Sequence, residues 1–295
     1  MYLGVHFPQG SIGNDPIAIR DYAQAVEEAG FDFLDATDHI AGAHPDRFLG
    51  VDGGFASPPY YYDDPFHEPF TLFAYLSGFT EKLEFATSIL VMPQRQTLLV
   101  AKQAAEVQLL SEGRLRLGVG AGWNSAEFES LNSDFQTRGR RLEEQIQVLR
   151  RVWSEPLVSF KGEWHSLDRV GIAPLPLKPI PIWIGSRALD PLLRRVARLA
   201  DGWMPLPIVG DATSILSTLR EYLRLEGRDP AAFGLQMGIS VEGGSTGDWL
   251  DAAKQRQTLG ATHLTINVGQ TDPSPRRSLE RTIEALRVLR EGMDV

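Results

Sequence analysis

Eight short apolar runs alternate with amphipathic segments along the whole chain, and this alternation limits the possible folds more than any other feature. The runs cover residues 3–7, 31–35, 83–92, 115–119, 181–184, 201–204, 235–241 and 263–268. Most of them are continuously apolar, which is typical of parallel strands covered on both faces. Eight strands, each followed by a helix, predict one domain over residues 1–295, an α/β (β/α)8 TIM barrel. A doubly wound open sheet is the alternative.

Three of the intervening segments show which helix face should be buried. Hydrophobic residues recur at helical spacing in the first, fourth and last helices. The predicted faces are Ile19, Tyr22, Ala23 and Val26; Leu142, Ile146, Leu149 and Trp153; and Leu279, Ile283 and Leu286. Three helix starts are predicted where a capping side chain precedes a proline, at Asp15-Pro16, Asp190-Pro191 and Ser274-Pro275.

Two connections are too long to be simple turns. Residues 36–69 are rich in Gly, Pro, Asp and aromatic residues, and residues 155–178 contain a predicted hairpin at 157–160 and 164–167. Long structured loops in compact domains are usually lids or binding loops. The first one follows the second strand at the C-terminal face of the barrel, where barrel active sites lie. We therefore expect long loops over the mouth of the barrel.

Composition excludes several classes of function. The net charge is −9 and no run of Lys or Arg stands out, which argues against nucleic acid or an anionic membrane as a partner. The lack of cysteine excludes disulfides, thiolate metal sites and a cysteine nucleophile. No signal peptide is visible, and no segment approaches the roughly 20 apolar residues of a membrane span. We expect a cytoplasmic protein.

The segment 114–123 reads as a strand that runs into a glycine-spaced turn. Gly118, Gly120 and Gly122 alternate there, and the turn ends on Trp123. Glycines let a flat or phosphorylated ligand approach the backbone, and an indole offers a face for stacking. The alternative is an ordinary strand-to-helix turn with Trp123 folded into the core.

In a barrel, the residues that follow each strand converge on one pocket. Asp38 and His39 follow the second strand and form the best acid/base candidate, because histidine titrates near neutral pH and a neighbouring carboxylate stabilises its charged form. The alternative is that Asp38 caps a short helix and His39 packs in the loop. Glu127 is a possible acid, but we expect it to face solvent.

A phosphate site and an aromatic wall are predicted at the same mouth. Gly185-Ser186-Arg187 precedes a helix, where backbone N–H groups, a hydroxyl and a guanidinium suit a phosphate; ordinary capping is the alternative. Phe7, Tyr60 and Trp123 are the candidate substrate contacts. Phe55, Tyr61 and Tyr62 are weaker candidates, for which loop packing is equally compatible.

The remaining histidines do not indicate a metal site. His263 opens the eighth strand and is expected to be structural, whereas His6 could point into the barrel mouth or outward to the helices. His44, His67 and His165 lie in loops without metal-ligand spacing. We therefore predict no metal site.

The chain resembles the luciferase-like monooxygenase superfamily, in particular the branch of probable F420-dependent oxidoreductases. The resemblance covers nearly the whole length. It rests on residues 4–9 (GVHFPQ), 37–40 (TDHI), 86–93 (ATSILVMP), 113–123 (GRLRLGVGAGW), 181–185 (PIWIG) and 200–203 (ADGW).

This resemblance implies a TIM barrel with a flavin or the deazaflavin F420 at its C-terminal mouth. It also implies a bulge after the third strand with a cis Ser88–Ile89 peptide bond, and a homodimer. The implied cofactor contacts are Asp38, Thr87, Ser88, Ile89, Gly120, Gly122, Trp123, Gly185, Ser186 and Arg187. The implied catalytic residues are His39, as proton donor or acceptor, and Asp38.

The expected activity is hydride transfer between F420 and a small organic substrate. Trp123 stands where sugar-phosphate dehydrogenases of this superfamily carry glutamate, so we do not expect that substrate. Ser186 replaces a second glycine found in many relatives. An FMN-dependent monooxygenase is the alternative within the family. A non-catalytic flavin- or ligand-binding barrel and a metal-free isomerase of phosphorylated substrates are the alternatives from other classes.

Overall fold

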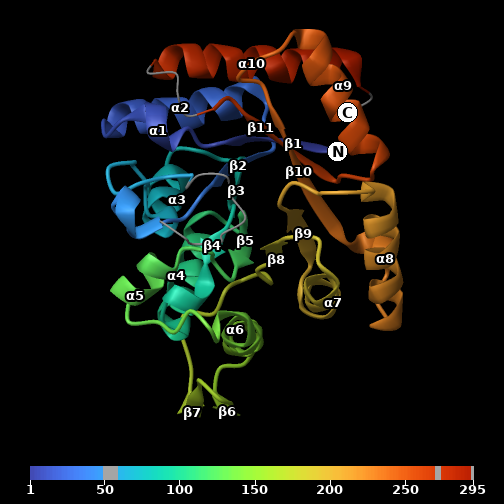
Figure 1. Ribbon diagram of the computed structural model, residues 1–295. Helices are drawn as coiled ribbons and strands as arrows, with labels where there is room; N and C mark the ends of the chain where they lie inside the picture. Colours follow the sequence, from blue (N-terminus) through green and yellow to red (C-terminus); the bar gives the residue numbers. More distant parts are fainter. Residues whose placement is uncertain (49–58, 270–273, 294–295) are drawn as a thin grey trace.

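Eight parallel strands close into a barrel in the computed structural model, which describes residues 1–48, 59–269 and 274–293 (Figure 1). The strands pair in the order β1, β2, β3, β5, β8, β9, β10 and β11, and pairing of β11 with β1 completes the ring. The predicted (β/α)8 barrel is therefore confirmed. The barrel strands are β1 (Tyr2–His6), β2 (Phe33–Ala36), β3 (Glu84–Thr87), β5 (Leu115–Gly120), β8 (Ile182–Ser186), β9 (Gly202–Pro205), β10 (Gly234–Ser240) and β11 (His263–Asn267).

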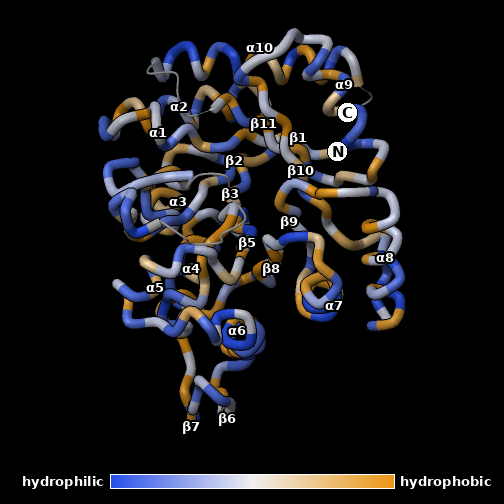
Figure 2. Tube along the Cα trace, in the orientation of Figure 1, coloured by the Kyte–Doolittle hydropathy of each residue, from blue (hydrophilic) through white to orange (hydrophobic). Residues whose placement is uncertain are grey.

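Helices surround the barrel and turn their apolar faces toward it, so hydrophilic residues are frequent along their outer sides (Figure 2). The described helices are α1 (Gln9–Ile12), α2 (Pro16–Ala29), α3 (Pro69–Ser77), α4 (Thr97–Leu110), α5 (Ser125–Ser130), α6 (Arg138–Ser154), α7 (Asp190–Leu199), α8 (Ala212–Leu225), α9 (Thr246–Thr258) and α10 (Pro275–Gly292). Short 3-10 turns are η1 (Pro45–Phe48), η2 (Met92–Gln94) and η3 (Pro230–Ala232). In the described ranges, no helix is sufficiently long and apolar to cross a membrane.

The third apolar run is divided into two strands. After β3 the chain forms a bulge at Ser88 and Ile89, whose peptide bond is cis as the resemblance implied, and then continues as β4 (Leu90–Val91) beside β5. The predicted hairpin is also present as β6 (Val158–Lys161) and β7 (Ser166–Val170), which project from the barrel below α6 (Figure 1).

Most helix predictions are confirmed, with two exceptions. The predicted faces of α2 and α6 are buried, and Asp15 and Ser274 cap their helices. Asp190 does not cap α7, because it is the first helical residue and its carboxylate binds Arg194 and Tyr222.

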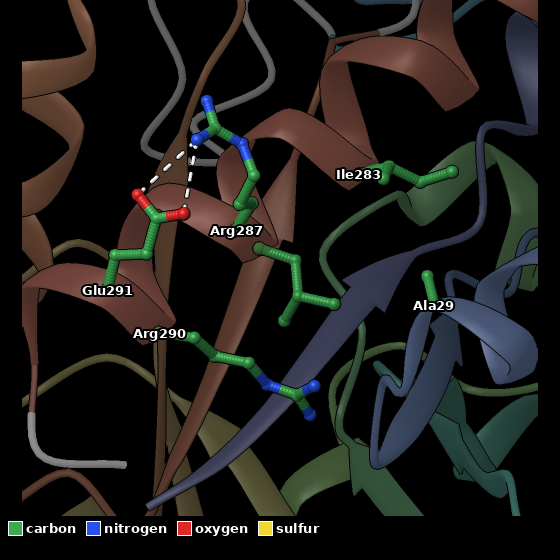
Figure 3. A pocket seen from close by; sticks show the side chains of 6 residues that line it. Ala29, Ile283, Arg287, Arg290 and Glu291 are labelled. Atoms are coloured by element: carbon green, nitrogen blue, oxygen red, sulfur yellow. Dashed lines mark hydrogen bonds and ion pairs between the residues drawn. The ribbon is translucent and has the colours of Figure 1, made fainter.

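The second exception is Ile283 of α10, which was predicted to be buried but is 38% exposed. It lines a surface groove of about 340 Å³ together with Ala29, Leu286, Arg287, Arg290 and Glu291 (Figure 3). Ala29 ends α2, just before the chain enters β2, so this groove lies at the end of the barrel opposite the mouth.

Glycines make room for the large side chains that fill the lower half of the barrel. A Cβ atom on Gly4 would lie 2.3 Å from the Phe33 ring, and one on Gly202 or Gly234 would lie 2.0–2.3 Å from the Trp183 ring. The His263 ring packs against this layer, tilted against Phe33 and edge-on to Trp183, and burial lowers its pKa to about 3, which agrees with the predicted structural role. The guanidinium of Arg116 lies in the same layer, 4.7 Å from the centre of the Phe33 ring and 4.5 Å from that of the Trp183 ring, so aromatic packing around one buried arginine closes the bottom of the barrel.

Candidate active site at the barrel mouth

The β3–β4 bulge forms an apolar shelf at the mouth. A Cβ atom on Gly120 would lie 2.4 Å from Ile89 Cδ1, and one on Gly185 would lie 2.6 Å from Ile89 Cγ2. Gly120 and Gly185, near the ends of β5 and β8, therefore leave room for the Ile89 side chain. A ligand bound at this place would contact Ile89. Gly122, with φ of +78°, makes similar room for Val91 and Phe128.

Thr87 lies behind the shelf. Its side chain is fully buried, and its hydroxyl donates a 2.6 Å hydrogen bond to the Gly118 carbonyl of β5. Thr87 thus ties the two strands together, whereas Ser88 and Ile89 are the partly exposed residues of the bulge.

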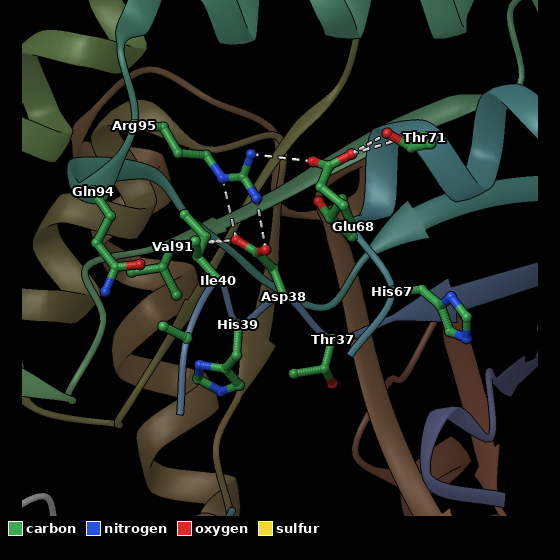
Figure 4. Close-up of polar contacts among 12 residues, drawn as sticks. Thr37, Asp38, His39, Ile40, His67, Glu68, Thr71, Val91, Gln94 and Arg95 are labelled. Carbon is green, nitrogen blue, oxygen red and sulfur yellow. Dashed lines mark hydrogen bonds and ion pairs between the residues drawn. The ribbon is translucent and has the colours of Figure 1, made fainter. Parts of the chain in front are cut away.

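The Asp38 carboxylate is hydrogen-bonded to Arg95 and not to His39, which differs from the pairing predicted from the sequence, although its charge still interacts with the His39 ring. Consecutive residues of an extended segment point to opposite sides, and Figure 4 shows Asp38 pointing to Arg95 and His39 pointing away from it. Asp38 is 1% exposed and accepts bonds from Arg95 Nη2 (2.7 Å) and the Val91 N–H (3.1 Å). Burial raises the pKa of the Asp38 carboxyl, and the Arg95 charge opposes this rise.

Arg95 extends this contact to the long loop. Its Nη1 donates to Glu68 Oε1 at 3.1 Å, and Glu68 caps the N-terminus of α3 through the Thr71 N–H (Figure 4). Burial opposes the charge of Arg95, but the nearby carboxylates of Asp38 and Glu68 raise its pKa overall. Arg95 therefore bridges Asp38 and Glu68 and holds the loop that precedes α3 in place.

Glu127 is the carboxylate that contacts His39. Its Oε2 lies 3.4 Å from His39 Nδ1, and Glu127 is 2% exposed, so the expectation that it faces solvent is wrong. Burial raises the pKa of a carboxyl group, but here the hydrogen bonds and charge of His39, with further donors, lower the pKa of Glu127 overall. The side chain therefore carries its negative charge beside His39 inside the protein.

Glu127 also fixes the start of the long loop. Its Oε1 accepts from the Ile40 N–H (2.6 Å) and the Ala41 N–H (3.1 Å), and its Oε2 accepts from Gln94 Nε2 (2.9 Å). Five donors, with Tyr60 as the fifth, converge on one buried carboxylate. Nothing in the local sequence indicates this, because the donors lie 33 to 88 residues away.

The long loop contributes an aromatic wall. The Tyr60 ring lies 3.8 Å from the His39 ring, centroid to centroid, and 5.7 Å from that of Trp123. The Tyr60 hydroxyl accepts from Asn124 at 2.7 Å and donates to Glu127 at 3.3 Å. Burial, followed by the charge of Glu127, raises the pKa of Tyr60, so the phenol stays protonated.

The other aromatic candidates differ in placement. Phe7 is fully buried and packs edge-on against Tyr22 of α2, so it belongs to the layer between strand and helix and does not line the mouth. Tyr62 is 63% exposed and stacks with His44. Tyr61 is partly buried, and Phe55 lies outside the described residues.

A pair of arginines lies beside the predicted phosphate site. Arg187 is exposed after β8, and Arg138 begins α6 and donates to the Gly122 carbonyl at 3.2 Å. Burial and then the positive charge of Arg187 lower the pKa of Arg138, so the two guanidinium groups are close enough to repel. Within the described ranges, neither forms an ion pair with a carboxylate. Ser186 Oγ accepts from Trp203 Nε1 at 3.1 Å.

His6 points into the barrel, which decides between the two orientations left open by the sequence. It is the register partner of Asp35 on β2, and its Nδ1 lies 2.5 Å from Asp35 Oδ1. His67 contacts Phe7, and His165, in the turn between β6 and β7, binds Glu144 and Thr97. Over the residues that the structure describes, no group of three or more acidic or histidine side chains could hold a metal ion.

Comparison with known proteins agrees with this architecture. A family model described as luciferase-like monooxygenase matches residues 2–246. A protein of Mycobacterium tuberculosis is 32% identical over 249 residues, which cover 83% of this chain and 82% of that protein. An F420-dependent glucose-6-phosphate dehydrogenase of Nakamurella multipartita is 31% identical over 230 residues, covering 72% and 60% of the two chains.

A solved structure has the same fold. The F420-dependent secondary alcohol dehydrogenase in complex with an F420–acetone adduct superposes with a TM-score of 0.76, at 17% identity and 98% coverage of both chains. The chain therefore belongs to the luciferase-like monooxygenase family and is an enzyme of its F420- or FMN-dependent oxidoreductase class.

Proposed function

We propose that the protein is an F420-dependent oxidoreductase that transfers a hydride between the deazaflavin and a small organic substrate. The observation that carries the proposal is a histidine, His39, held at the mouth by a buried carboxylate, Glu127. Hydride transfer to or from an organic substrate is coupled to proton transfer, and a fixed, partly exposed imidazole suits that task. The similarity to an F420-dependent dehydrogenase supports this choice of cofactor.

The residues at the mouth fit such a cofactor. Ile89 offers an apolar surface for a flat ring, and Trp123 and Tyr60 form an aromatic wall beside His39. Arg138 and Arg187, with the backbone at Gly185 and Ser186, offer two positive charges to a phosphate. When bound, F420 supplies a carbon atom that accepts or donates a hydride.

The chain's own residues would perform the remaining steps. His39 would hold or release the proton at Nε2, because Nδ1 faces Glu127. Glu127 would fix the orientation of the ring and stabilise its protonated form. Tyr60 would cover one face of the imidazole and limit the access of water. Asp38 and Arg95 would hold the loop that carries His39.

An FMN-dependent monooxygenase is the second candidate. The long loop that places Tyr60 on His39 supports it, because oxygen chemistry on a flavin needs a site that excludes water. The description of the matching family model supports it as well.

Paired titrations with F420 and with FMN, followed by intrinsic tryptophan fluorescence, test the proposal. Tighter binding of F420 is expected and would direct screening to hydride donors and acceptors. Preferential binding of FMN, together with substrate-dependent oxygen consumption, would replace the proposal with the monooxygenase. Binding of neither compound would refute both.

A further inference from the structure

A second histidine lies in the barrel, with its own carboxylate partner. His6 ends β1 and Asp35 lies opposite it in β2, with Nδ1 and Oδ1 2.5 Å apart. The Asp35 side chain is 1% exposed, whereas that of His6 is 12% exposed. The buried carboxylate therefore lies behind the imidazole, and His6 is the member of the pair that reaches toward the mouth.

The rest of the barrel interior fixes Asp35 in place. Its Oδ2 accepts from Gln236 Nε2 of β10 and from Thr265 Oγ1 of β11, each at 2.7 Å. With His6 as the third donor, both carboxylate oxygens are satisfied. Arg116 of β5 is the further charged group whose field acts on Asp35 from below. Groups on three strands thus hold one carboxylate in a single orientation.

The other ring nitrogen of His6 is connected to the bulge. Nε2 lies 3.3 Å from Thr37 Oγ1, which lies 3.3 Å from the Ser88 carbonyl. Thr37 has one hydroxyl proton, so it donates either to His6 or to Ser88. With neutral His6, the hydroxyl donates to Nε2. With protonated His6, Nε2–H donates to Thr37 and the hydroxyl turns to Ser88. Both protonation states are therefore fully hydrogen-bonded.

We propose that His6, oriented by Asp35 and linked to the bulge through Thr37, is a second proton-transfer group on the floor of the mouth. The inference rests on the proposed function, because it assigns His6 to the same hydride-transfer site. Oxidation of an alcohol at this site would release a hydride and the hydroxyl proton of the substrate, and bound F420 would supply the positions for one hydride and one proton. Two proton transfers at different atoms occur, and two separately held histidines, His39 and His6, match that number.

The histidine–carboxylate pair can be tested without cofactor. In the full-length protein labelled with 15N-histidine, NMR should show neutral His6 as a single tautomer with the proton on Nδ1, and H6Q identifies its signals. D35N should convert this signal to a mixture of tautomers. An unchanged tautomer in D35N, or a proton on Nε2 in the wild type, would overturn the role of Asp35.

The link to the site is tested by calorimetric titration with F420 in two buffers of different ionisation enthalpy. We expect binding to be coupled to a fraction of a proton that is lost in H6Q and altered in T37V. The cofactor's own ionisation is common to all variants and cancels in the comparison. H44Q, which removes an exposed histidine, is the control and should match the wild type. An equal proton count in H6Q and wild type, with F420 bound to both, would overturn the inference.

The two proposals fail in distinguishable ways. If F420 binds and only the proton linkage is missing, the cofactor assignment stands and His6 is a structural residue. If the wild type binds neither F420 nor FMN, the proposed function is refuted and the proton-transfer role of His6 with it. Thermal unfolding of each variant identifies any loss that results from misfolding.

Discussion

Glu127 Oε2 lies 3.4 Å from His39 Nδ1, although the two residues are 88 positions apart in the chain. The same carboxylate accepts the N–H groups of Ile40 and Ala41, so it holds both the imidazole and the backbone that follows it. This one buried charge therefore determines the geometry of the candidate active site.

Replacing Glu127 with glutamine should destabilise the protein. E127Q keeps one acceptor oxygen but removes the charge and turns an amide toward existing donors, so we expect a loss of about 2 kcal/mol in the free energy of unfolding. Urea denaturation measures it. E129Q changes an exposed glutamate two residues later, paired with Arg47, and should alter stability by less than about 0.5 kcal/mol. Equal losses in both variants would contradict the role assigned to Glu127.

The Asp38–Arg95 pair should show strong coupling. D38N leaves the Arg95 guanidinium buried without its main partner, for an expected cost of about 3 kcal/mol. The double variant D38N/R95M should lose less than the sum of the single variants, with a coupling energy of about 1–3 kcal/mol. D21N, in an exposed pair with Arg20, is the control and should cost less than about 1 kcal/mol. If the losses of unfolding free energy in the two single variants were additive, Asp38 and Arg95 would not be energetically coupled.

The close contact between Gly120 and Ile89 predicts that shortening Ile89 should reduce the cost of enlarging Gly120. G120A places a methyl group 2.4 Å from Ile89 Cδ1, and the expected cost is about 1–3 kcal/mol. I89V removes that terminal carbon, so G120A should be less costly in an I89V background, as chemical denaturation would show. G243A, where no atom lies within 4 Å, should have little effect. An equal cost of G120A in both backgrounds would refute the contact.

His263 should make the protein sensitive to acid. Burial, together with the charges of Arg116 and the N-terminus, lowers its pKa from 6.5 to about 3. Between these pH values the unfolded chain binds a proton that the folded protein does not, so stability falls as the pH drops through this window. H263F removes this difference, and its stability should decline less steeply below pH 6.5, by up to about 1 kcal/mol per pH unit. Parallel pH profiles for H263F and wild type would contradict the shift.

The barrel could be predicted because its determinants are local. Most strands are continuous apolar runs, and the position of His39 shortly after a strand predicts that it lies at the mouth. The partners could not be predicted, since Arg95 and Glu127 reach Asp38 and His39 only after barrel closure brings distant loops together. The orientation of His6 required the strand register, because one residue of shift would turn its side chain to the other face.

We propose that the mouth holds F420 with its phosphate at Arg138 and Arg187. The most direct test is the dissociation constant of F420 for the wild type and for R138Q/R187Q, with the deazaflavin that lacks the phosphate as a matched ligand. We predict that the double variant binds F420 at least about tenfold more weakly, which corresponds to about 1.4 kcal/mol, and binds the phosphate-free compound unchanged. Equal affinity of both proteins for F420 would contradict the claim.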